Sequence, residues 1–115
     1  MPPREWRLRI EDILEAIHKI QRYVSGLSFD EFCADDKVVD AVVRNLEVIG
    51  EAARHIPPEI ESRHPDLPWI EMRGMRNILV HEYFGINPSI LWHTIQQNLP
   101  QIIERLDKIL ASENE

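Results

Sequence analysis

The chain reads WIEMRGMRNILVHEYFG from Trp69 to Gly85. The apolar residues of this stretch recur at spacings of three and four, at Met72, Met75, Leu79 and Tyr83. This spacing places them on one side of an α-helix and predicts that this side packs against a core. Because Pro68 precedes the stretch and Gly85 ends it, the sequence predicts one helix of about four turns.

The polar residues of the predicted helix suggest its chemistry. At about 100° per residue, Asn77 and His81 share one face, and Arg76 lies about 140° from His81 with Asn77 between them. An arginine guanidinium can bind a phosphate through two nitrogens, and a histidine can transfer a proton near neutral pH. The three residues can therefore border one cleft suited to phosphodiester chemistry. The alternative is a surface arginine and a histidine packed near the core.

Another helix is predicted at the start of the chain. Apolar residues recur at spacings of three and four over residues 6–24, which predicts an amphipathic helix that Gly26 closes. Ser28 and Glu31 then have the spacing of a capping box. They predict a short turn that holds Phe29 and Phe32.

A further apolar stripe runs over residues 38–56. It predicts a helix that begins at Asp35 or Asp36 and that Pro57-Pro58 ends. A short helical piece is expected over Glu59–Arg63. The segment from His64 to Pro68 should be a loop, since each of its prolines disfavours helix at the residue before it.

The last predicted helix follows the quoted stretch. Asn87 suits its N-cap and Pro88 its first position, and the apolar stripe continues over residues 91–109. Pro100 interrupts this stripe, so we expect a kink or a break near Leu99. Residues 112–115 are expected to form a frayed polar end.

These elements predict an all-α, up-and-down bundle of four main helices and a short one, in a single domain over residues 1–115. The formal net charge of −7 argues against a broad basic surface. Nucleic acid would then be bound locally, by a basic island of Arg73, Arg76 and their counterparts in a second subunit. The single cysteine, Cys33, cannot form an internal disulfide and is expected to be a small buried residue. No apolar run is long enough for a membrane span or a secretory signal, so we expect a cytoplasmic protein.

The string from Arg76 to Tyr83 resembles the signature of the HEPN superfamily, in which an arginine and a polar residue are followed by a histidine. The tyrosine two positions after the histidine resembles the HepT-like branch. This branch consists of toxins from two-gene toxin–antitoxin systems whose antitoxin is a minimal nucleotidyltransferase. The likeness covers essentially the whole chain and includes the segments Asp12–Ile17, Ala41–Ala52 and Pro68-Trp69.

This resemblance implies a metal-independent ribonuclease, without a cofactor, whose composite site lies at the interface of a two-fold dimer. It implies catalytic roles for Arg76 and His81 with support from Asn77, and we place Arg73 beside them as a second supporting residue. It also implies that the partner nucleotidyltransferase adenylylates the hydroxyl of Tyr83. The expected partners are an RNA substrate, a second copy of the chain and the cognate antitoxin. The alternative function is a non-catalytic helical adaptor that binds a nucleotide or presents a substrate to such an enzyme.

Other residues allow different interpretations. The pairs Glu15/His18 and Glu61/His64 match the ligand spacing of di-iron helical bundles, although they fall at the edge of a stripe and next to a loop. Glu51 and His55 are more simply a surface pair, and His93 is expected to be solvated. Gly74 costs about 1 kcal/mol inside a helix. It could admit a substrate or a second subunit, or it could pack closely against the helix that begins at Asp35 or Asp36.

Overall fold

The computed structural model describes residues 5–82 and 87–113, without the side chains of residues 77–82. Within these ranges the elements are helical throughout, which confirms the all-α prediction. In chain order they are α1 (Trp6–Val24), α2 (Phe29–Ala34), α3 (Asp36–Ala53), α4 (Pro58–Arg63), α5 (Trp69–Glu82), α6 (Pro88–His93), the π-helical turn η2 (Thr94–Asn98) and α7 (Leu99–Ser112).

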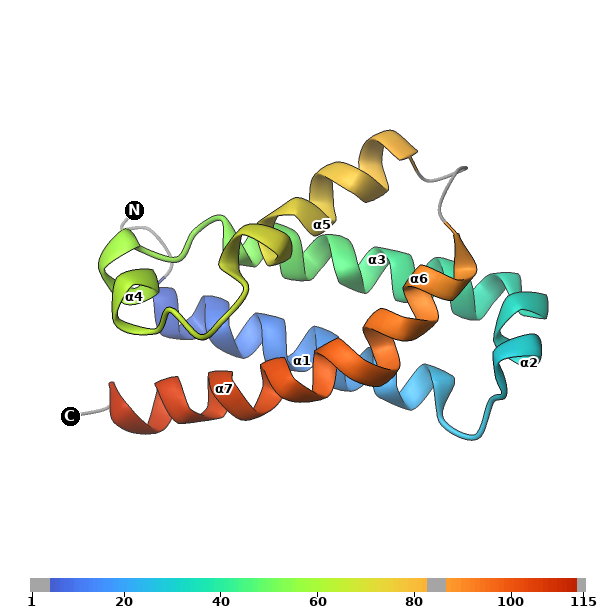
Figure 1. Cartoon of the computed structure of the whole chain (residues 1–115), viewed down its shortest axis with the longest axis horizontal. Coiled ribbons are helices and arrows are strands. Elements are labelled where there is room, and N and C mark those ends of the chain that lie inside the picture. The colour runs from blue at the N-terminus through green and yellow to red at the C-terminus, as the bar shows by residue number, and fades with distance from the viewer. Residues whose placement is uncertain (1–4, 83–86, 114–115) are drawn as a thin grey trace.

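The long helices run alternately up and down the molecule (Figure 1). α3 packs against α1 on one side and α5 on the other, and α7 packs against α1. α6, η2 and α7 follow one another in a single descending segment, so the described part of the chain has four long helical segments, as the sequence predicted. The second half of α5 diverges from α3 in this view, and the start of α1 and the end of α7 both lie at the end of the bundle near α4.

The predicted apolar stripes form the core. α1 contributes Ile10, Ile13, Ile17 and Ile20, each with no exposed surface. The stripes of α3 and α7 are buried as well, and Met72 of α5 is fully enclosed while Met75 packs at the core's margin. At about 25 cal/mol per Å² of apolar surface, burial of these side chains is the main force that holds the helices together.

The connection after α1 contains one helix more than expected. Gly26 has a φ of 80°, the left-handed conformation that ends a helix most easily at glycine. Ser28 and Glu31 form the predicted capping box, with Ser28 Oγ accepting from the Glu31 backbone N–H at 3.1 Å. The residues after Ser28 then form the six-residue helix α2 rather than a simple turn. Its buried Phe32 packs against Trp92 with ring centroids 5.2 Å apart.

The prediction that Cys33 is buried is wrong, because Cys33 is exposed. Once residues 29–34 are helical, successive side chains point about 100° apart. Phe32 occupies the face of α2 that meets the core, so the next residue is turned toward solvent.

α3 ends earlier than its apolar stripe suggested. The helix stops at Ala53, and Ile56 is buried in the turn that follows. In this turn the backbone N–H groups of His55 and Ile56 bond to carbonyls three residues back, at 3.1 and 3.3 Å. Pro57 explains the early end, since it has no N–H to bond to the Ala53 carbonyl four residues back and its ring would clash with that carbonyl.

The expected irregularity near Leu99 is a π-helical turn. Across η2 the Leu99 N–H bonds to the Thr94 carbonyl, five residues back, and α7 then begins with Pro100 in its first turn. Because Pro100 has no N–H and its ring would clash with the carbonyl four residues earlier, a widened turn before it removes the conflict. The prediction of a kink or break at this position is confirmed.

The expectation of a frayed end is wrong for Glu113. Its carboxylate lies 3.0 Å from Arg63 and 3.0 Å from His64, and its carbonyl accepts from Arg7. These contacts join the end of α7 to α4 and α1, and the Glu113 side chain is 14% exposed. Tertiary contacts therefore fix a position that looks solvated in the sequence.

Candidate functional site

α5 lies against α3 at Gly50. A Cβ atom at this glycine would lie 2.6 Å from the Arg76 backbone nitrogen and 2.9 Å from its Cβ. Such distances are too short for any side chain, so the absence of one at position 50 lets the two helix backbones meet. This contact fixes the position of the Arg76 backbone and Cβ, from which the side chain extends over the surface of the bundle.

Gly74 does not have the packing role that was considered for it. A Cβ atom built there meets no described atom within 4 Å apart from its chain neighbours and the backbone of its own helix. Close packing of Gly74 against α3 is therefore wrong, because the close approach is made from the α3 side, at Gly50. Among the residues that the structure describes, the space beside Gly74 is open.

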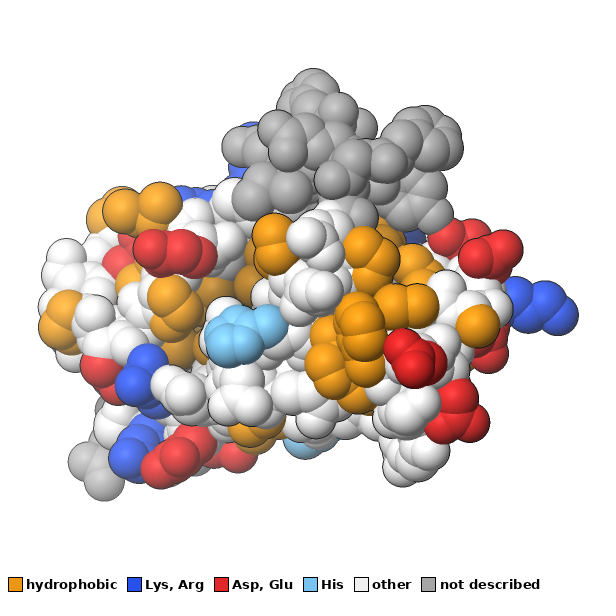
Figure 2. Space-filling model, turned by 45° about the vertical axis from the view of Figure 1, so that its right-hand side comes forward, with side chains coloured by type: hydrophobic (Ala, Val, Ile, Leu, Met, Phe, Trp, Pro, Cys, Tyr) orange, Lys and Arg blue, Asp and Glu red, His pale blue; other side chains and the backbone are white. Residues whose placement is uncertain are grey.

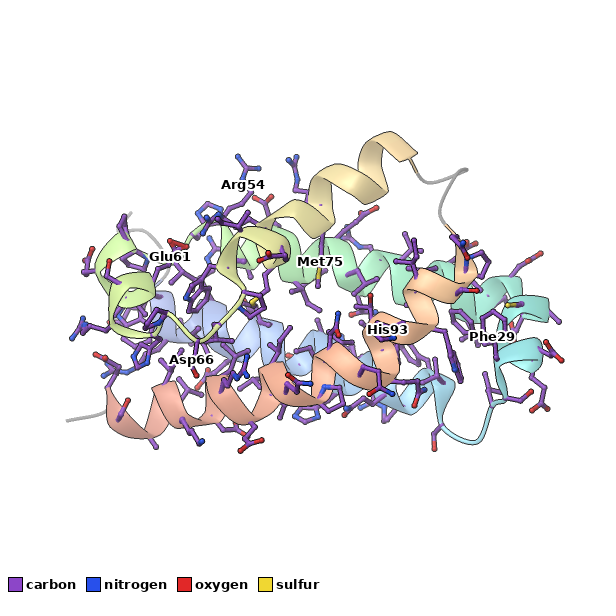
Figure 3. All side chains as sticks on the ribbon, viewed as in Figure 1. Phe29, Arg54, Glu61, Asp66, Met75 and His93 are labelled. Atoms are coloured by element: carbon purple, nitrogen blue, oxygen red, sulfur yellow. The ribbon has the colours of Figure 1, made fainter. Side chains whose placement is uncertain are left out.

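The Arg76 guanidinium forms an ion pair across the helix interface. Its Nε lies 3.1 Å from Oε2 of Glu51, the residue after Gly50 on α3. The same Oε2 lies 3.4 Å from Arg54 Nη1, and Oε1 lies 3.3 Å from His55 Nε2. Figure 3 labels Arg54, which projects on the outer side of the bundle beside α5. The expected Glu51–His55 surface pair is confirmed, and it is part of a larger cluster.

This cluster lowers the pKa of Glu51. The main cause is the hydrogen bond with His55. Burial acts in the opposite direction, and the positive charges of Arg54 and Arg76 each lower the pKa by a smaller amount. The carboxylate is therefore held in its ionised form.

A hollow of about 420 Å³ adjoins the ion pair. Its walls come from α1, α3 and α5, and its charged lining residues are Arg9, Asp12, Arg44, Glu47, Glu51 and Arg76. Arginines and carboxylates both line it, so the hollow can offer hydrogen-bond donors and acceptors to a ligand. Its volume is within the range that small ligands occupy in proteins.

Arg73 does not line this hollow. It forms an ion pair with Glu61 of α4, one turn of α5 before Arg76. Figure 3 labels Glu61 between α4 and the first turns of α5. Arg73 and Arg76 each have a carboxylate partner in the single chain, and the basic island that was expected to include a second subunit stays a prediction. Arg73 instead ties α5 to α4.

The remaining predicted site residues fall where the structure gives no side chain. The backbone of Asn77 and His81 belongs to α5, but their side chains lie outside the described part. Tyr83 lies outside the described residues altogether. Their placement around Arg76 therefore stays a prediction.

Residues of both Glu/His pairs that were considered as metal ligands form ion pairs with other residues. Glu15 is exposed on α1 and pairs with Lys19 at 3.4 Å, and Glu61 and His64 pair with Arg73 and Glu113. Among the residues that the structure describes, no three His, Cys, Asp or Glu side chains gather as a metal site would require. His93 is exposed, as expected.

The face of the molecule drawn in Figure 2 carries charged side chains of both signs. On the face in Figure 2, acidic side chains lie at both ends of the molecule and hydrophobic side chains lie between them. Lysines and arginines lie toward the margins of the coloured surface in this view, so it has no broad basic patch. Ile90 is 64% exposed on α6.

None of the described helices is long and apolar enough to cross a bilayer.

Sequence reasoning missed the link between Glu51 and Arg76. The spacing along α3 pairs Glu51 with His55 and gives no sign of a residue on another helix. The signal that was present is the Gly50-Glu51 dipeptide, in which a helical glycine marks a close approach and the next residue lies beside it.

The sequence of this chain is similar to a known protein family and to several named proteins. Residues 13–109 match the family described as Ribonuclease HepT-like. The chain is 40% identical over 100 residues to a protein of Thermococcus cleftensis named as a probable ribonuclease HepT, covering 87% of this chain and 91% of that protein. It is 40% identical over 104 residues to a provisionally named RNase of Caldanaerobacter subterraneus subsp. tengcongensis, covering 90% and 93%. A provisionally named RNase of Methanocaldococcus jannaschii is 38% identical over 110 residues, covering 96% and 91%. No solved structure matched the chain.

Proposed function

Because this chain belongs to the HepT-like ribonuclease family, we propose that it is a metal-independent endoribonuclease and the toxin of a two-gene toxin–antitoxin system. One observation on this molecule itself supports the proposal. Arg76 is 42% exposed, lines the charged hollow and lies on the helix that also carries His81 in sequence. An arginine at the rim of a ligand-sized hollow can bind the scissile phosphate.

Arg76 and His81 are the proposed catalytic residues. Cleavage of RNA without a metal needs a base for the 2′-hydroxyl proton, an acid for the leaving oxygen and positive charge near the phosphorus. His81 would move the protons and Arg76 would supply the charge. Asn77 would orient one of them, and Arg73 would support the site through its tie to α4.

A two-fold dimer would complete the proposed site. One histidine cannot readily act as acid and base in the same step, whereas two subunits would bring two Arg76–His81 pairs to one cleft. The open space beside Gly74, two residues before Arg76, is compatible with a second subunit approaching α5.

The proposed regulation acts through Tyr83. A cognate minimal nucleotidyltransferase would transfer adenylyl groups to its hydroxyl, which lies two residues beyond His81 in sequence. The added phosphate would place negative charge and bulk where the RNA phosphate must bind, and so block cleavage.

The proposal is tested by RNA cleavage with purified variants. Arg76→Ala and His81→Ala should each abolish cleavage while the helical circular dichroism spectrum is kept, and cleavage by the parent should persist in a chelator. Arg22→Ala and His93→Ala remove the same residue types at exposed positions elsewhere and should cleave normally. Cleavage that requires a metal ion, or that survives in His81→Ala, would defeat the assignment. A parent protein that binds the nucleotidyltransferase but cleaves no RNA would favour the adaptor function.

A further inference from the structure

Glu51 contacts the proposed catalytic arginine from a neighbouring helix. We propose that Glu51 is a positioning residue that holds the Arg76 guanidinium in place for the RNA phosphate. This inference rests on the proposed role of Arg76 in cleavage. It is carried by the 3.1 Å ion pair between the two side chains and by the close approach of their helices at Gly50.

Arg76 needs such a partner because its side chain is long and partly exposed. Packing at Gly50 fixes the Arg76 backbone against α3, but it leaves the outer part of the side chain free to rotate. An arginine gives up much rotational freedom when it binds a phosphate, so fixing it beforehand lowers the cost of the step. Glu51 lies where it can do this, since it follows Gly50 directly.

Glu51 can hold Arg76 because its own carboxylate is held. Oε1 faces His55 at 3.3 Å, and Oε2 faces Arg54 at 3.4 Å as well as Arg76. The helical residues around it, Gly50 and Ala52, are buried in the interface, so the base of the side chain is fixed by the core. The chain of contacts therefore runs from the end of α3, through Glu51, to the guanidinium.

The ion pair does not cancel the charge that a phosphate needs. Two arginines, Arg54 and Arg76, share the single carboxylate of Glu51. The cluster therefore keeps a net positive charge, and a phosphate remains attracted to it. A carboxylate shared in this way restrains Arg76 without neutralising the cluster of Glu51, Arg54 and Arg76.

The opposite role would be competition, in which Glu51 occupies Arg76 and RNA must displace it. The two roles predict opposite changes. A competitor, once removed, raises cleavage, whereas a positioning residue, once removed, lowers the turnover number.

The test measures kcat and KM for Glu51→Gln and Glu51→Ala on a defined RNA. Gln keeps the length of the side chain and removes its charge. Both variants should lower kcat, with Ala lowering it on the order of 10-fold, within the roughly 100-fold that a misplaced catalytic group can cost. KM should stay the same or fall, because a negative charge beside the phosphate is gone. Glu104→Gln, which removes one exposed, ion-paired helical glutamate on α7, is the matched control and should leave both values unchanged.

A second measurement reads the Arg76 side chain without cleavage. In proton–nitrogen NMR spectra, the Arg76 Nε–H signal is assigned by its loss in Arg76→Lys. In Glu51→Gln this signal should shift, and its exchange with water should become faster. Glu104→Gln should leave it in place.

The outcomes separate the positioning role from the proposed function. If Arg76→Ala still cleaves RNA, the catalytic role of Arg76 fails, whatever Glu51 does. If Arg76→Ala is inactive while Glu51→Gln and Glu51→Ala keep or raise kcat, the positioning role alone is overturned. An unchanged Arg76 Nε–H signal in Glu51→Gln, or an equal loss of kcat in Glu104→Gln, also overturns it.

Discussion

The backbone of Arg76 rests directly on Gly50, and a methyl group at position 50 would lie 2.6 Å from the Arg76 nitrogen. The glycine that matters for the candidate site is thus on α3, although the sequence of α5 contains a conspicuous glycine of its own. The contact places the Arg76 side chain beside Glu51 and at the rim of the charged hollow.

Gly50→Ala should destabilise the protein by about 1–3 kcal/mol, as overpacking of a close contact does, despite the better helix propensity of alanine. Gly74→Ala is its control on α5, away from the contact between α3 and α5. Because nothing in the described chain lies near a Cβ at position 74, that variant should gain up to about 1 kcal/mol. Urea unfolding of both variants measures the difference. A Gly50→Ala variant as stable as the parent would contradict the packing described above.

The purified protein should be a two-fold dimer at micromolar concentration, because the proposed site needs a second Arg76–His81 pair. Sedimentation velocity measures this directly. A monomer at that concentration would count heavily against the composite site. If Gly74→Ala weakens the dimer while each subunit stays folded, the space beside Gly74 belongs to the subunit interface.

Tyr83→Phe should keep cleaving RNA but escape control by the nucleotidyltransferase. After coexpression with the partner and ATP, the parent should gain the mass of one or more adenylyl units at Tyr83, with cleavage falling in step. The Phe variant should gain no such mass at this position and remain toxic beside the partner. Equal neutralisation of both proteins would mean that inhibition comes from binding rather than from modification.

Stability should depend on Glu51 in acid. Its pKa is lowered in the folded state from the ordinary value of 4.5, first by the His55 hydrogen bond and then by Arg54 and Arg76. A lowered folded-state pKa means that the contribution is fully present above the ordinary pKa and is lost as the pH falls through the folded-state value. Thermal unfolding between about pH 6 and pH 3 should therefore show a smaller loss of stability for Glu51→Gln than for the parent. Glu104→Gln should follow the parent; if Glu51→Gln does too, the cluster adds no acid-sensitive stability.

The order of the helices could be predicted because its signals are local. The stripe over residues 6–24 forms α1, and the proline at position 100 gives the expected irregularity. The capping box at Ser28 forms as predicted, but it begins the helix α2 rather than a turn. The prediction for Glu113 was wrong because its partners come from distant parts of the chain. The prediction for Cys33 was wrong because residues 29–34 form a helix, which turns Cys33 away from the core. That residues 1–115 form a single domain stays a prediction.

Some features of the candidate site could also be predicted from local signals, and others could not. The sequence by itself determined that Arg76, Asn77 and His81 share one helix, since the helical period follows from spacing, and it carried the resemblance that the family match bears out. Only the tertiary structure decided that α5 contacts α3 at Gly50. It also decided that Arg76 pairs with Glu51 and that Arg73 pairs with Glu61. The physical reason is that the facing of two helices depends on how all the side chains between them fill space, and no local spacing encodes that.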